Sequence, residues 1–75
     1  MLVKRKQEKM DFPERLRALR KSKNMTQEDL VETLGISLRA YRYYERGQRE
    51  PTLSTLVALA DFYDLSLDEL VGRER

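Results

Sequence analysis

Two short helices joined by a glycine turn are predicted in the middle of this chain, and this pair limits the possible folds most strongly. Thr26 is a favourable N-cap, and Asp29 gives a variant of the capping box with an acidic charge at the helix start. Gly35 ends that helix, because the left-handed conformation expected there would penalise a β-carbon. Ser37 caps the next helix and Gly47 closes it. The sequence therefore predicts a sharp corner between two helices.

Apolar residues at helical spacing predict one helix before this pair and two after it. The first begins near Asp11–Pro13 and stops near Lys23–Asn24, the fourth follows a cap at Thr52, and a short fifth follows a cap at Ser66. No segment alternates with period two, so no strand is expected. The predicted fold class is all-α, a compact five-helix bundle. In the first, second, fourth and fifth helices, in that order, the residues predicted to face inward are Phe12, Leu16 and Leu19; Leu30, Val31 and Leu34; Leu53, Leu56, Val57, Leu59, Ala60 and Tyr63; and Leu67, Leu70 and Val71.

A chain of 75 residues allows one small domain. We expect that domain over residues 11–72, with a flexible basic arm at 1–10 before it and a C-terminal tail at 73–75. The arm could reach phosphates or a minor groove, or it could simply be disordered, and the sequence leaves both open.

The residue types that are missing exclude several classes of function. Cysteine and histidine are absent, which removes disulfides, thiolate metal sites, the commonest metal ligand and the commonest general base. The chain has no glycine-rich phosphate loop and no convincing pair of gathered carboxylates. We therefore expect no catalytic residue, no metal, no cofactor and no enzyme. No apolar run suits a signal peptide or a membrane span, so a cytoplasmic location without a membrane partner is predicted.

The net charge of +2 conceals an uneven distribution. Residues 1–49 contain thirteen Lys and Arg against seven Asp and Glu, whereas residues 50–75 contain two basic and six acidic residues. This asymmetry is typical of a protein that approaches a polyanion in one orientation, although an ordinary solvated surface explains it equally well.

The third predicted helix has two contrasting sides on a helical wheel. The inward side is aromatic and holds Tyr41 and Tyr44, with Ser37 and Glu45 beside them. The opposite side has no acidic residue and holds Arg39, Tyr43 and Arg46, flanked by Arg42. The turn before the helix should present this basic side to solvent.

The chemistry of the basic side suits DNA. Arg39, in the first turn, is best placed to bond a guanine's O6 and N7, a pair worth roughly 1–3 kcal/mol of discrimination. Tyr43 could bond a base edge or a phosphate, and Leu38 could touch a thymine methyl or simply pack. Gln27 could lie against a phosphate beside the free N–H groups of its helix start, or be a tolerated polar residue. Backbone phosphates are the expected partners of Arg42, Arg46 and Arg49.

The ordered motifs of the chain resemble those of the Cro/CI-type (XRE-like) repressors of phages and bacteria. The resemblance covers about residues 12–72 and rests on Leu16-Arg17-Ala18-Leu19-Arg20, Thr26-Gln27-Glu28-Asp29-Leu30, Gly35-Ile36-Ser37, Tyr41 through Gly47, Pro51 and Leu65-Ser66-Leu67-Asp68-Glu69-Leu70. It implies a lambda-repressor-like fold, a recognition helix beginning at Ser37, and an ion pair between Arg20 and Glu45. The sequence departs from the family at Val31, where alanine is usual, and at Leu38 and Ala40, where many relatives are polar.

These observations predict a sequence-specific regulator of transcription, a repressor that binds a pseudo-palindromic operator in double-stranded DNA as a homodimer. Its DNA-binding residues would be Gln27, Ser37, Leu38, Arg39, Arg42, Tyr43, Arg46 and Arg49. The dimer surface could be formed by Leu65, Leu67, Leu70 and Val71, or these side chains could only complete the core of the monomer. The alternative function is an antitoxin-like adaptor of the same fold whose main partner is another protein. The chain could also be the N-terminal module of a longer repressor.

Overall fold

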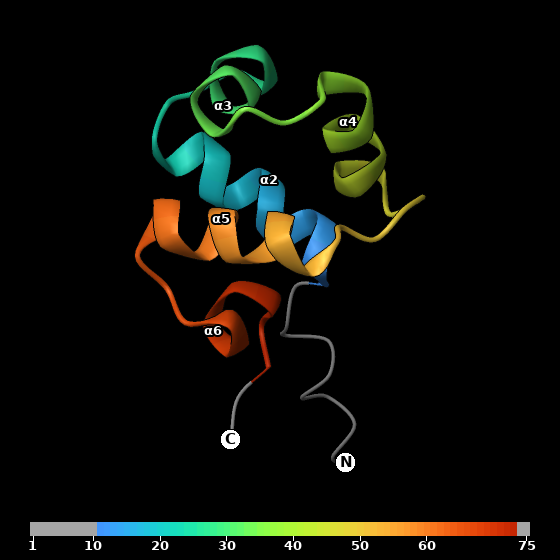
Figure 1. Ribbon diagram of the computed structural model, residues 1–75. Coiled ribbons are helices and arrows are strands. Elements are labelled where there is room, and N and C mark those ends of the chain that lie inside the picture. Colours follow the sequence, from blue (N-terminus) through green and yellow to red (C-terminus); the bar gives the residue numbers. More distant parts are fainter. Residues whose placement is uncertain (1–10, 74–75) are drawn as a thin grey trace.

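The computed structural model describes residues 11–73, which form five helices and no strand (Figure 1). The helices are α2 (Phe12–Ser22), α3 (Gln27–Leu34), α4 (Leu38–Arg46), α5 (Leu53–Tyr63) and α6 (Leu67–Val71). This architecture confirms the predicted all-α fold class. The expected basic arm at 1–10 and the last two residues of the expected tail lie outside the described residues, so the predicted domain boundaries stay predictions.

Side-chain caps explain where the helices begin. Asp11, Thr26, Ser37, Thr52 and Ser66 each accept a hydrogen bond from the backbone N–H three residues further on. At the start of α3 the capping box is complete, because Thr26 N also donates to the Asp29 carboxylate at 3.1 Å. That backbone hydrogen bond lowers the pKa of Asp29.

Two glycines fix the sharp ends of α3 and α4. Gly35 has φ +70° and Gly47 has φ +73°, in the left-handed region where a β-carbon is penalised, as the sequence predicts for Gly35. At Gly47 a β-carbon would also lie 3.2 Å from Cγ of Pro13. The end of α4 is therefore packed closely against the start of α2.

Each helix contributes one fully buried side chain to a single core. These side chains are Leu16, Leu30, Tyr41, Leu59 and Leu70, each with 0% of its surface exposed. All five lie at positions that the sequence periodicity assigns to the inward faces. The helices pack in the pairs α2–α4, α3–α4, α2–α6, α3–α5 and α5–α6.

The predicted inward face of α5 was too wide. Leu53 and Val57 are 68% and 41% exposed, although the apolar pattern included both. At 100° per residue they lie on one edge of the apolar face, whereas Leu59, Ala60 and Tyr63 lie nearer its centre and are buried. The neighbouring helices cover only part of the apolar face of α5.

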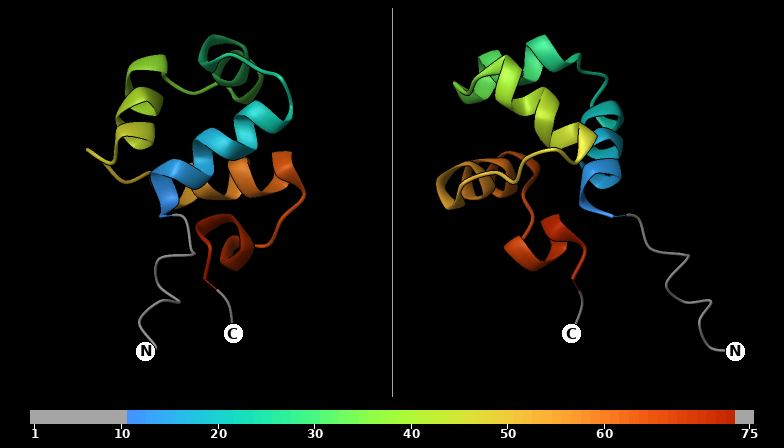
Figure 2. Two further views of the ribbon diagram at one scale, coloured as in Figure 1. Left: turned by 180° about the vertical axis from the view of Figure 1, so that it is seen from behind. Right: turned by 90° about the vertical axis from the view of Figure 1, so that its right-hand side faces the viewer.

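The arrangement of the helices separates the two ends of the domain. Figures 1 and 2 show α3 and α4 together at one end and α6 at the other, with α2 and α5 between them. One long side of α4 consequently faces away from the rest of the domain, and this side carries the residues discussed next.

Candidate nucleic-acid interface

The two sides of α4 differ as the sequence predicts. Tyr41, Tyr44 and Glu45 are buried on the inward side, with 0%, 7% and 3% of their surface exposed. The outward side forms a shallow, open hollow lined by Leu38, Arg39, Arg42, Tyr43 and Arg46. Its three arginines are exposed, so their guanidinium groups can meet a ligand from solvent.

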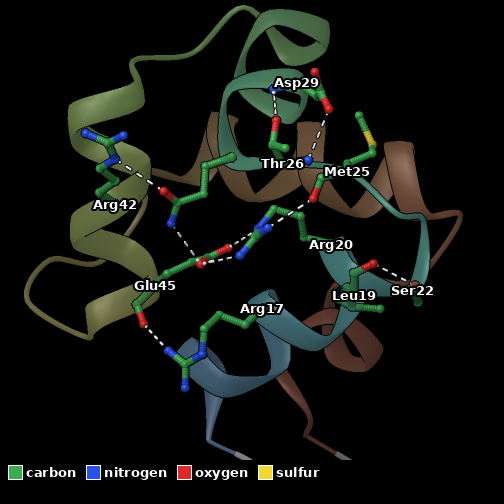
Figure 3. Close-up of polar contacts among 10 residues, drawn as sticks. Arg17, Leu19, Arg20, Ser22, Met25, Thr26, Asp29, Arg42 and Glu45 are labelled. Atoms are coloured by element: carbon green, nitrogen blue, oxygen red, sulfur yellow. Dashed lines mark hydrogen bonds and ion pairs between the residues drawn. The ribbon is translucent and has the colours of Figure 1, made fainter.

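A buried carboxylate fixes α4 against α2. Arg20 donates from Nε to Oε2 of Glu45 at 2.8 Å and from Nη2 to Oε1 at 3.1 Å, a two-point geometry that orients both groups. Arg17 donates to the backbone carbonyl of Glu45. Figure 3 shows both arginines reaching from α2 to this one residue of α4. The structure thus contains the Arg20–Glu45 pair that the family resemblance implies.

The protonation of Glu45 reflects this environment. Burial by itself would raise the pKa of its carboxyl group, but the hydrogen bonds from Arg20 and Gln27 outweigh burial and lower that pKa. The hydrogen bond to Glu45 likewise raises the pKa of Arg20. Both groups are therefore charged at neutral pH. The contacts of Glu45 are those of a structural residue that joins α4 to α2.

Gln27 joins the buried pair to the surface. Its Nε2 donates to Oε1 of Glu45 at 3.1 Å, and its Oε1 accepts from Nε of Arg42 at 3.2 Å. Nη2 of Arg42 lies 3.4 Å from a carboxylate oxygen of Glu28. The Gln27 amide therefore bridges α3 and α4, and the phosphate contact that the sequence left open for it stays a prediction.

The remaining candidate residues differ in how firmly they are held. Arg49, in the loop after α4, places its guanidinium 4.9 Å from the centre of the Tyr43 ring, which is a cation–π contact. Leu38 packs partly against the core, in line with the packing alternative. Ser37 uses its side chain as the N-cap of α4, accepting from Ala40 N at 3.1 Å. Arg39 is exposed in the first turn of α4, and its contact with a base stays a prediction.

The comparison with known proteins decides the family. A family model described as helix-turn-helix matches residues 16–70. The chain belongs to the helix-turn-helix family. This result confirms the resemblance to the Cro/CI-type (XRE-like) branch that the motifs indicate.

Relatives of known sequence and structure agree with this family. The chain is 45% identical over 64 residues to the cryptic phage CTXphi transcriptional repressor RstR of Vibrio cholerae, covering 85% of this chain and 57% of RstR. Its fold is similar to that of a transcriptional regulator from Listeria innocua, with a TM-score of 0.78, 34% identity and coverage of 87% and 61%. For the restriction-modification controller protein C.AhdI from Aeromonas hydrophila, the TM-score is 0.71, the identity 37% and the coverage 79% and 89%. The chain spans little more than half the length of RstR and of the HTH-type transcriptional regulator AnsR of Bacillus subtilis, to which it is also 45% identical.

Burial bears on the two alternatives that the sequence leaves open for the leucine-rich C-terminal end. Leu70 is completely buried and Leu65 packs against the core, so both stabilise the monomer. Leu67 is 41% exposed, like Val57, and Leu53 is more exposed than either. Among the described residues, the exposed large apolar side chains therefore lie mostly on α5, and α6 contributes Leu67.

Sequence analysis did not single out Arg17 or Glu28. Arg17 belongs to the motif Leu16-Arg17-Ala18-Leu19-Arg20, and this membership is the only indication in the sequence that Arg17 has a role. Glu28 meets Arg42 only because α3 and α4 cross, which no spacing in the sequence reveals. Among residues 11–73 no group of three acidic side chains could hold a metal ion, and no helix is long and apolar enough to cross a membrane.

Proposed function

We propose that this chain is a sequence-specific regulator of transcription that places α4 in the major groove of double-stranded DNA. The observation that carries the proposal is the outward side of α4, where Arg39, Arg42 and Arg46 are exposed with no acidic residue on the same helix face. A helix fits the major groove, and arginine bonds both bases and phosphates. The name of RstR as a transcriptional repressor supports the same conclusion and favours repression.

Within this proposal the arginines divide into two roles. Arg39 reads a base, because it lies in the first turn of α4, the part of a recognition helix that enters deepest. Tyr43 lies one turn later and contacts a base edge or phosphate, next to Leu38 at the edge of the hollow. Arg46 and Arg49 bind phosphates. Gln27 and Ser37 contribute polar groups at the starts of α3 and α4.

The DNA-bound form is proposed to be a homodimer. One α4 reads only a few base pairs, whereas a two-fold dimer places two such helices about 34 Å apart on a pseudo-palindrome. Leu53 and Val57 are separated by one helical turn at the start of α5 and are exposed, which suits them for the dimer contact. The proposed location is the cytoplasm, where such DNA is accessible.

Selection of bound duplexes from a random pool tests the proposed function. The wild-type protein should enrich a pseudo-palindrome, and Arg39→Ala should lose preference at one position of each half-site. Arg49→Ala should keep the selected sequence, weaken binding to all duplexes and lower the salt slope by about one. Failure to enrich any sequence, together with a small protein that co-purifies, would favour the protein-binding adaptor instead.

A further inference from the structure

Arg42 differs from the other arginines on the outward side of α4. Among the described residues, it forms an ion pair with Glu28, at 3.4 Å, whereas Arg39 and Arg46 form none. The side chains of Arg42 and Glu28 remain 44% and 63% exposed. The pair is therefore open to solvent, and an anion that approaches α4 can compete with Glu28 for the guanidinium group.

The position of the Arg42 guanidinium is set from the interior of the domain. Its Nε donates to Gln27, Gln27 donates to Glu45, and Glu45 is held by Arg20. Figure 3 shows the dashed hydrogen bonds that link Arg42 on α4 to Glu45 and from there to Arg20. Nε of Arg42 remains bonded to Gln27 when Nη2 loses its contact with Glu28. Nη2 can therefore change partner while the guanidinium group stays in place.

We propose that Glu28 is a built-in competitor that occupies Arg42 in the free protein and is exchanged for a backbone phosphate when DNA binds. The inference rests on the proposed function. A carboxylate and a phosphate present similar oxygen pairs to the arginine fork, so both fit the same donors. Glu28 also lies in the first turn of α3, beside Gln27, where the helix start favours an anion.

This exchange lowers the part of the affinity that does not depend on sequence. Glu28 withdraws a donor from the phosphate and adds a negative charge next to it, while Arg39 is not involved. Removing the negative charge of Glu28 should therefore strengthen binding to every duplex by a similar factor. Because both side chains are exposed, salt screens the pair and the effect should decrease as the salt concentration rises.

The test compares Glu28→Gln with Glu32→Gln in the wild-type and Arg42→Ala backgrounds. Glu32 is an exposed residue one turn further along α3, so its substitution removes the same charge from the same helix. At low salt, Glu28→Gln should tighten binding to the selected operator and to a random duplex alike, by about two- to fivefold. Glu32→Gln should change both by less than half as much. In the Arg42→Ala background the effect of Glu28→Gln should shrink to that of Glu32→Gln.

Two results would overturn the inference while leaving the proposed function intact. Equal effects of Glu28→Gln and Glu32→Gln would show that only the net charge matters. An undiminished effect of Glu28→Gln in the Arg42→Ala background would show that Glu28 does not act through Arg42. A wild-type protein that binds no duplex would overturn both proposals. Thermal unfolding of each variant confirms that the compared proteins are folded, which is expected because these side chains are exposed.

Discussion

The junction of α2, α3 and α4 and the junction of α5 and α6 share one apolar core, but the first also contains a buried ion. At the first, the buried carboxylate of Glu45 receives directional hydrogen bonds from Arg20 and Gln27. At the second, the fully buried side chains are apolar, namely Leu59 and Leu70. Apolar packing supplies free energy with little directional preference, whereas hydrogen-bonded ions define an orientation. Hydrogen bonds to a buried carboxylate thus fix the orientation of the helix proposed to enter DNA.

We call the junction of α2, α3 and α4 the polar junction and that of α5 and α6 the apolar junction. The largest expected effect comes from breaking the polar junction. Glu45→Ala leaves Arg20 largely buried without its carboxylate, and we expect a loss of about 3–5 kcal/mol in the free energy of unfolding. Glu50→Ala, which removes the same charge from an exposed loop, should change it by no more than about 0.5 kcal/mol. Urea unfolding of both variants measures the difference. Equal stabilities would contradict a structural role for Glu45.

The apolar junction should respond to cavity formation instead. Leu59→Ala removes a completely buried side chain from α5 and should cost about 2–4 kcal/mol. Leu53→Ala makes the same change on the same helix at a position that is 68% exposed, and should cost the monomer little. Denaturation at a concentration where the protein is monomeric separates the two. Similar losses of stability in Leu59→Ala and Leu53→Ala would contradict the burial of Leu59 and the exposure of Leu53.

How far the sequence predicts this contrast depends on the kind of interaction. The helix starts follow from local capping residues such as Thr26 and Ser37, and the two sides of α4 follow from its periodicity. The exposure of Leu53 and Val57 was mispredicted, because a periodic pattern does not say how much of an apolar face the neighbours cover. The contacts of Arg42 with Gln27 and Glu28 depend on the crossing of α3 and α4, which is a tertiary property.

Lowering the pH should weaken the polar junction but not the apolar one. The folded state lowers the pKa of Glu45 below its ordinary value of 4.5, so its stabilisation is complete above about pH 4.5 and is lost as the pH falls through the folded-state pKa. We expect the urea midpoint to decrease as the pH falls below about 4.5. Leu59→Ala should keep this pH dependence, whereas Glu45→Gln should reduce it. An unchanged slope in Glu45→Gln would assign the acid sensitivity to other carboxyl groups.

The smallest expected effect comes from a buried hydroxyl group on α5. The hydroxyl of Tyr63 is buried with no hydrogen-bond partner among the described residues, and burial raises the pKa of Tyr63 to about 12. Removing an unpaired buried hydroxyl relieves a desolvation cost, so Tyr63→Phe should stabilise the protein by about 1 kcal/mol. Thermal and urea unfolding test this expectation. A loss of stability would show that the hydroxyl is satisfied in solution.

The proposal that the outward side of α4 reads DNA is tested most directly by one cycle of binding measurements. It combines wild type and Arg39→Ala with the selected operator and with the same duplex altered at the base pair assigned to Arg39. The wild type should lose about 1–3 kcal/mol of binding free energy on the altered duplex, and Arg39→Ala should bind both duplexes equally. Full discrimination by Arg39→Ala would contradict base reading by this residue, and discrimination by neither protein would contradict sequence recognition at that base pair.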